Sequence, residues 1–320
     1  MNLIKKIQEN IFRYELFERG AKIVVGVSGG PDSVCLSDAL YKLKEKYDLQ
    51  IIVAHVNYGL RGKDSDLDEK LVKSLAEKYS LPIEILKVKK TEKSEENLRK
   101  IRYNFFEAVC KKHKADRIAV GHNQSDQAET VLMRILRGTG LKGLGAIKFK
   151  NNNIIRPILN IPRKEIVAYL RSNKTPYRID KTNLGTNFTR NKIRNNLLPQ
   201  LEKRYNPNIQ ETLFKFSQSV ADDYDFIARF ANVWIAANKI PKVSSLNKLH
   251  PAICREVLRQ TLEKYIPSLR EIESVHIDEI LKILKSSKGK RQLIAFKGLK
   301  IERIGDKLII GKQVTKASNS

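Results

Sequence analysis

Short apolar segments that alternate with amphipathic stretches limit the possible folds of this chain more than any other feature. Four such segments occur in its first half, at residues 23–27, 51–56, 83–88 and 117–121. The first two are continuous apolar runs, as in buried parallel strands, whereas 83–88 alternates in polarity and is expected nearer an edge. In the stretches between them, apolar residues recur every three or four positions, as on helices that pack against a sheet. The pattern predicts an α/β fold, with a mainly parallel sheet and helices on both faces.

The pattern changes after about residue 185, where the chain becomes rich in Arg and Asn. A long helical segment is expected next, and short helices and strands follow it. We therefore predict three parts, namely an α/β domain at 1–206, a helical connector at 207–240 and a small α/β domain at 241–320.

The chain is strongly basic, with 61 Lys and Arg against 35 Asp and Glu and a net charge of +26. A field of this size attracts polyanions, and nucleic acid is the leading candidate. Residues 286–320 are basic as well, and either a solvated surface or an RNA-contacting surface explains them. No apolar run of about 18 residues is present, so no membrane-spanning helix is expected. The N-terminus also lacks the apolar core of a signal peptide, and the cytoplasm is the expected location.

A glycine-rich segment directly follows the first predicted strand and opens a helix. Its two glycines allow a tight turn and a close approach of the backbone to a ligand. The N–H groups at the start of the helix suit an anion such as pyrophosphate, and two serines add hydroxyl donors. The alternative is an ordinary helix-capping turn. The segment consists of Ser28, Gly29, Gly30, Pro31, Asp32 and Ser33.

Ser-Gly-Gly-x-Asp-Ser resembles the PP-loop of ATP pyrophosphatases, and Pro31 in the fourth position is similar to the tRNA(Ile)-lysidine synthetase branch of that superfamily. Further segments resemble the same branch in the same order along the chain. They are 55–62, 96–103, 121–130 and 190–194, together with Asp180-Lys181-Thr182-Asn183. Four positions depart from the family pattern: Tyr58 and Asn123 each replace a His, Thr182 replaces a Ser, and Ser125 replaces an Asp, which removes one candidate acid.

The resemblance implies the use of ATP with Mg²⁺, and it makes 1–206 the catalytic domain and 241–320 a tRNA-binding domain. The implied substrates are free L-lysine and a tRNA(Ile) with a CAU anticodon. The C2 carbonyl oxygen of the wobble cytidine would attack the α-phosphate of ATP and release pyrophosphate, and the amine of lysine would then attack C2 and displace AMP to form lysidine.

The same resemblance implies a role for each matching residue. The implied catalytic residues are Asp32, Asp126, Glu129, Arg99 and Arg102. Besides residues 28–33, His55 and Arg61 are expected to bind ATP. The expected substrate-binding residues are His122, Asp180, Asn183, Arg190 and Arg194. Asp32 and Asp126 are the candidate Mg²⁺ ligands.

Three other functions compete with this hypothesis. A tRNA thiolase of the same superfamily would need reactive cysteines, and Cys35, Cys110 and Cys254 are scattered without a Cys-x-x-Cys pair. A small-molecule synthetase would not need the large positive charge. A non-catalytic RNA-binding protein would not need so many acids and arginines around a nucleotide loop. The sequence leaves open whether the chain forms a homodimer.

Overall fold

The computed structural model describes residues 2–88, 94–179, 189–238, 241–266, 272–287 and 291–312. The chain divides into two compact units, Met1–Ser219 and Val220–Ser320. Helix α11 (Ile209–Ala237) crosses the boundary between the units. No helix in the described ranges is both long enough and apolar enough to span a membrane.

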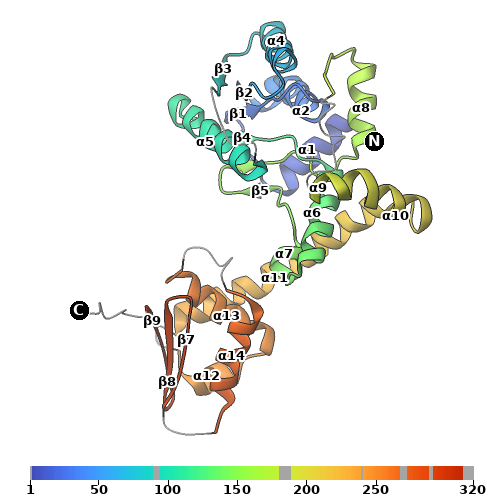
Figure 1. The fold of residues 1–320 in the computed structure, drawn as a ribbon. Coiled ribbons are helices and arrows are strands. Elements are labelled where there is room, and N and C mark those ends of the chain that lie inside the picture. Colours follow the sequence, from blue (N-terminus) through green and yellow to red (C-terminus); the bar gives the residue numbers. More distant parts are fainter. Residues whose placement is uncertain are drawn as a thin grey trace, which may run out of the picture. The chain divides into compact units, whose positions relative to one another are not determined.

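The first unit contains a six-stranded sheet and the helices that cover it (Figure 1). Its strands are β1 (Lys22–Gly26), β2 (Gln50–Asn57), β3 (Ile83–Lys87), β4 (Arg117–Ala119), β5 (Lys150–Asn151) and β6 (Ile154–Ile155). Its first helices are α1 (Leu3–Arg13), α2 (Pro31–Lys42), α3 (Lys44–Tyr47), α4 (Lys63–Lys78) and α5 (Glu95–His113). They are followed by α6 (Gln124–Arg137), α7 (Leu141–Leu144), α8 (Arg163–Ser172), α9 (Thr189–Lys192), the π-helix η2 (Ile193–Leu197) and α10 (Leu198–Arg204).

The strand order in this sheet is β3-β2-β1-β4-β6-β5, and every neighbouring pair is parallel except β5 with β6. The prediction of a mainly parallel sheet is confirmed, and so is the edge position of β3. After β1 the chain adds β2 and β3 on one side of it and β4 on the other. Ligands of such sheets bind beyond the carboxyl ends of the strands where the order reverses, and this point lies next to β1.

Alternate residues of the central strands enter two different cores, because successive side chains of a strand point to opposite faces. Ile23 and Val25 of β1 pack in the large core with α1, α2, α4 and α8. Val24, between them, packs in a second core whose helical side chains come from α5, including Phe106 and Val109. The sheet therefore has helices on both faces, as predicted.

The apolar face of α6 is buried only along its first turns. Ala128 and Val131 of α6 are buried, but Ile135 and Leu136 further along are 48% and 64% exposed. The apolar spacing continues to the end of α6, whereas the packed surface that covers its first turns does not.

The second unit packs helices against a three-stranded antiparallel sheet of order β7-β8-β9. Its helices are α12 (Val243–Asn247), α13 (Pro251–Glu263) and α14 (Ser274–Lys285), and its strands are β7 (Arg291–Phe296), β8 (Leu299–Ile304) and β9 (Lys307–Lys312). Buried side chains of α13, α14 and β8, among them Leu258, Ile280 and Ile301, form a core of its own. This agrees with the small α/β module expected from the sequence.

Candidate active site

The glycine-rich loop connects β1 to α2, and the hydroxyl of Ser33 holds it closed. Ser33 Oγ accepts a hydrogen bond from the backbone N–H of Ser28 at 3.0 Å and donates to the carbonyl of Gly30 at 3.0 Å. Gly29 has φ +87°, a left-handed conformation that glycine adopts without a steric penalty. The loop is therefore shaped largely by its own residues.

The first turn of α2 is open to an anion. Gly30 is the N-cap residue and no side chain caps this end, while Pro31 occupies the first turn. The N–H groups and the positive end of the helix dipole are thus available to phosphate. Gly121, after β4, packs directly on this turn, because a Cβ built on it would lie 3.0 Å from the carbonyl carbon of Asp32 and 3.0 Å from the nitrogen of Ser33. Any larger residue at 121 would push the turn away.

Asn123 connects the phosphate loop to α6. Its side-chain amide donates to Asp32 Oδ1 at 2.8 Å, and its backbone N–H donates to Asp126 Oδ2 at 3.0 Å. Its amide oxygen accepts from the N–H groups of Ser125 and Asp126, so Asn123 also caps α6. The Asn that departs from the family pattern therefore has two structural tasks, and neither is apparent from the sequence.

Asp32 lies at the start of α2 with both carboxylate oxygens in hydrogen bonds. Oδ2 pairs with Arg163 at 2.7 Å, a residue that the sequence analysis did not single out. Burial raises the pKa of Asp32; the guanidinium of Arg163 opposes this, and the negative charge of Asp126 adds to it. A cation bound near both carboxylates would favour the ionised form of Asp32.

Two acids of α6 and two arginines from α9 and η2 form an ion-pair network, which we call the acid–arginine cluster. Arg190 pairs with Glu129 at 2.8 Å and with Asp126 at 3.1 Å, and Arg194 makes the same two contacts at 2.5 and 3.1 Å. The side chain of Glu129 is 0% exposed, whereas that of Asp126 is 15% exposed. Burial by itself would raise the pKa of Asp126, but the guanidinium groups of Arg190 and Arg194 and the hydrogen bond from the backbone N–H of Asn123 oppose this and keep that pKa low.

A second group of cations surrounds His122. Arg99 and Arg102 of α5 lie 4.9 and 5.6 Å from the ring centroid of Tyr103. The pKa of His122 is lowered, mainly because burial disfavours its charged form; Arg156, Arg102 and Arg99 add to this effect, and Asp126 opposes it. Among the residues that the structure describes, Nδ1 of His122 is buried without a hydrogen-bond partner. His122 is therefore neutral near pH 7 and has a ring nitrogen available to a ligand.

His55 and Arg61 flank the loop from β2 and from the segment that follows it. His55 is 2% exposed, with Nδ1 2.8 Å from the carbonyl oxygen of Val27 and Nε2 without a partner. Burial lowers the pKa of His55, so its ring is neutral. Arg61 pairs with Asp68 of α4 at 2.5 Å.

Arg178 ties the loop to α4, and sequence reasoning missed it. Its backbone N–H donates to the carbonyl of Gly29 at 2.9 Å. Its guanidinium pairs with Asp68 and with Asp64, each at 2.7 Å. Asp68 also lies beside the loop, because its Cβ would be 3.5 Å from a Cβ built on Gly29. Arg178 lies two residues before the family-like segment that begins at Asp180 and is not part of it, so the sequence pattern does not mark it.

The structure thus gathers most of the predicted site residues into three neighbouring groups, around the loop, the acid–arginine cluster and His122. The predicted substrate residues Asp180 and Asn183 lie outside the described residues. Asn123, Arg163 and Arg178 are additional residues of the site.

Asp32 and Asp126, the predicted Mg²⁺ ligands, are bridged by Asn123. Within the ranges that the structure describes, no group of three or more His, Cys, Asp or Glu side chains could hold a metal ion by itself. Mg²⁺ is normally bound by one or two carboxylates together with water and substrate phosphates. The two carboxylates fit an ion that is shared with the phosphates of a nucleotide.

The fold and the loop define an enzyme of the PP-loop class, which uses ATP. A family model described as a PP-loop domain matches residues 2–201. The chain is 37% identical over 329 residues to the tRNA(Ile)-lysidine synthase of Clostridioides difficile (96% of this chain, 70% of the relative). It is 35% identical to that of Caldanaerobacter subterraneus subsp. tengcongensis (98% and 70%) and 38% identical to that of Clostridium tetani (90% and 65%). The chain belongs to the tRNA(Ile)-lysidine synthase family, and it spans 65% to 70% of the length of these relatives.

Among solved structures, the U34-tRNA thiolase NcsA from Methanococcus maripaludis with its [4Fe-4S] cluster is similar in fold. The TM-score is 0.57 at 20% sequence identity, over 69% of this chain and 78% of that chain. The two proteins share the architecture of the PP-loop domain.

Proposed function

We propose that this chain joins free lysine to C2 of the wobble cytidine of a tRNA(Ile) with a CAU anticodon, with ATP converted to AMP and pyrophosphate. One observation carries the proposal: Asn123 connects a loop suited to phosphate with a cluster of ionised acids suited to an amine. The relatives are named as tRNA(Ile)-lysidine synthases, and in the reaction we propose adenylation needs the loop while the attack of the amine needs the acids.

In the first step, O2 of the cytidine attacks the α-phosphorus of ATP, and the bond to pyrophosphate breaks. Residues 28–33 and the N-terminus of α2 hold the departing pyrophosphate. Arg99 and Arg102 offset the charge that develops on the α-phosphate. Mg²⁺, held by Asp32 and Asp126, would neutralise phosphate charge when bound.

In the second step, the ε-amine of lysine attacks C2 and AMP leaves with the former O2. The amine must first lose a proton, because its ordinary pKa is about 10.4. We assign Asp126 as the base that accepts this proton, because Glu129 is fully buried whereas Asp126 is partly exposed. His122, neutral and with Nδ1 unpaired, lies beside Asp126 and can accept a hydrogen bond from a substrate.

The cysteines disfavour the thiolase alternative. Cys35, Cys110 and Cys254 are all buried and unpaired. Burial raises the pKa of each thiol, most strongly that of Cys35, so none becomes the thiolate that sulfur transfer requires.

The test is incorporation of radiolabelled lysine into a CAU-anticodon tRNA(Ile) in the presence of ATP and Mg²⁺, with tRNA(Met) as the competing substrate. We expect incorporation that depends on ATP and falls at least about a hundredfold in Asp32→Asn. Asp126→Asn should lose lysine transfer but keep part of the release of pyrophosphate. Pyrophosphate release without incorporation by the unaltered protein would point to a different nucleophile. Folded protein that does neither would refute the proposal.

A further inference from the structure

The helical segment from α9 to α10 has two faces of different chemistry. Arg190 and Arg194 on its inner face reach the acids of α6. Ile193 and Leu198 on the same side are 2% and 3% exposed and pack with Ala128. The inner face thus belongs to the active site already described, whereas the outer face has no role in it.

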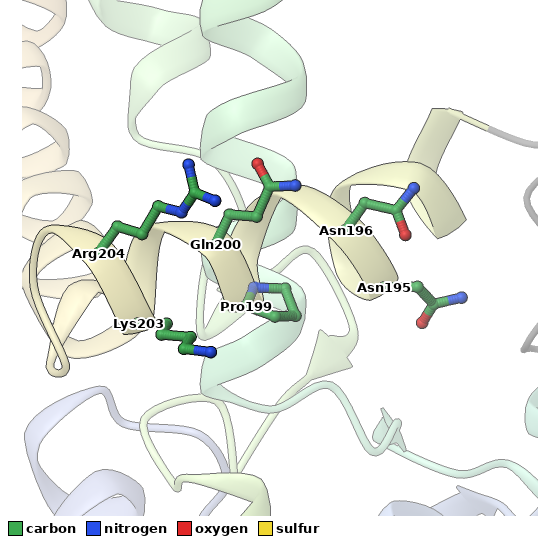
Figure 2. Close-up of a pocket in the computed structure, with 6 residues that line it drawn as sticks. All are labelled: Asn195, Asn196, Pro199, Gln200, Lys203 and Arg204. Carbon is green, nitrogen blue, oxygen red and sulfur yellow. The ribbon is translucent and has the colours of Figure 1, made fainter.

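The outer face carries amide and cationic side chains around an open hollow of about 440 Å³. Figure 2 shows that its six residues all come from the continuous helical segment formed by η2 and α10. They are Asn195, Asn196, Pro199, Gln200, Lys203 and Arg204. None of them is acidic, so the hollow presents amides that donate and accept hydrogen bonds and cations that only donate.

Three local features set this face apart from an ordinary charged helix surface. Residues 193–197 form a π-helical turn, a rare conformation that is frequent at functional sites. Pro199, at the start of α10, has no N–H to donate to the turn before it. Tyr205, directly after α10, is 78% exposed, so its ring is available for stacking.

We propose that this outer face binds the RNA strand that flanks the reacting nucleotide. Cations and amides recognise phosphates, ribose and base edges, and an exposed aromatic ring stacks on an unpaired base. Arg194 and Arg204 are ten residues apart, about 15 Å along a helix. That distance equals roughly four nucleotides of stacked strand at 3.4 Å each. An RNA loop whose target base lies at the acid–arginine cluster therefore reaches this face with its neighbouring nucleotides. The inference rests on the proposed function and adds the residues that hold the RNA.

Lys203 and Arg204 also lie in the last turn of α10, where cations stabilise the helix dipole. A purely structural role would lower the thermal stability of a variant without changing the salt dependence of RNA binding. The two roles can therefore be separated by experiment.

The test measures the Kd of the full chain for a tRNA(Ile) transcript with a CAU anticodon across salt concentrations. In Lys203→Gln with Arg204→Gln, we expect the Kd to rise about tenfold and the salt slope to fall by about 1.4 to 1.8, the value for two phosphate contacts. In Asn196→Ala with Gln200→Ala, we expect the Kd to rise about threefold with an unchanged slope, because amides release no counterions. The matched control is Lys111→Gln with Lys112→Gln, which removes two neighbouring cations from the far end of α5.

If the control pair Lys111→Gln with Lys112→Gln changes the Kd and the salt slope as much as Lys203→Gln with Arg204→Gln does, only the general positive field acts, and the inference is wrong. It is also wrong if Lys203→Gln with Arg204→Gln loses thermal stability but keeps the slope of the unaltered protein. Lysine incorporation by the unaltered protein separates the two proposals. Incorporation without an effect of the outer-face variants overturns this inference alone, whereas RNA binding without incorporation overturns the proposed reaction alone. A protein that binds no RNA overturns both.

Discussion

The phosphate loop and the acid–arginine cluster are joined through Asn123, but they are built in opposite ways. The loop consists of consecutive residues, and Ser33 closes it through contacts with residues no more than five positions away. The cluster joins α6 to residues that lie 61 to 68 positions further along the chain. The loop is therefore shaped mainly by local geometry, whereas the cluster exists only when the unit is folded.

This difference determines how each part should respond to change. A substitution in the cluster should disturb the fold and the chemistry together, because buried charges lose their partners. A substitution next to the loop should mainly change the position of the bound phosphates. Four predictions test this contrast, from the largest expected effect to the smallest.

Glu129→Gln should cost the most stability. It leaves Arg190 and Arg194 facing a neutral, buried amide, and we expect the free energy of unfolding to fall by about 3 kcal/mol. Urea denaturation measures this. Glu211→Gln, which removes an exposed pair with Lys215, should cost far less stability, because solvent screens the pair. Equal losses in the two variants would mean that the cluster does not hold α9 and η2 against α6.

Gly121→Ala should disturb the loop from outside. Its Cβ would lie 3.0 Å from backbone atoms of Asp32 and Ser33, which cannot rotate away as a side chain can. We expect about 2 kcal/mol of lost stability and about a tenfold loss of ATP affinity, measured by calorimetry. Gly140→Ala is the matched control, since a Cβ there meets nothing within 4 Å. Unchanged ATP affinity in Gly121→Ala would show that the loop tolerates displacement of the turn.

Arg178→Ala should loosen the loop without unfolding the unit. It removes the pairs with Asp68 and Asp64 but keeps the backbone bond to Gly29. We expect the KM for ATP to rise about fivefold, with little change in the KM for lysine, because the phosphates alone lose their position. Arg178→Lys should recover only part of the loss, because its ammonium keeps the positive charge but cannot make the same forked contact. An equal rise in both KM values would point to a general loss of structure instead.

Acid should weaken the fold through His55, which lies beside the loop. Burial lowers the pKa of His55 in the folded protein, whereas in the unfolded chain it titrates near about 6.5. Below that pH the unfolded chain binds more protons than the folded protein. The free energy of unfolding therefore decreases as the pH is lowered, by up to about 1.4 kcal/mol per pH unit for one group. Urea denaturation at about pH 7 and about pH 5.5 should give a smaller difference in His55→Gln than in the unaltered protein. If His55→Gln and the unaltered protein lose the same stability between these two pH values, His55 is not the group responsible.

The sequence was sufficient for those parts that are continuous along the chain. The strands around Ile23 and Ile52 were predictable because buried parallel strands are apolar at every position. The phosphate loop was predictable because its glycines, serines and acid are neighbours. The two-sided arrangement of the helices followed from the alternation of the elements.

Contacts between distant residues could not be read from the sequence in the same way. Asn123 departs from the family pattern, and its bond to Asp32 depends on the approach of β4 to α2. Arg163 and Arg178 are two arginines among many, and only the fold brings them to the loop. The apolar spacing of α6 continues through Leu136, but spacing cannot tell where the packed surface ends.

The acid–arginine cluster holds two negative and two positive charges, so it is electrically balanced before any substrate arrives. An amine that enters as an ammonium ion makes the cluster positive, and the balance returns only when a guanidinium moves away or when the proton passes beyond Asp126 to solvent. The cluster in this respect behaves as an ion exchanger.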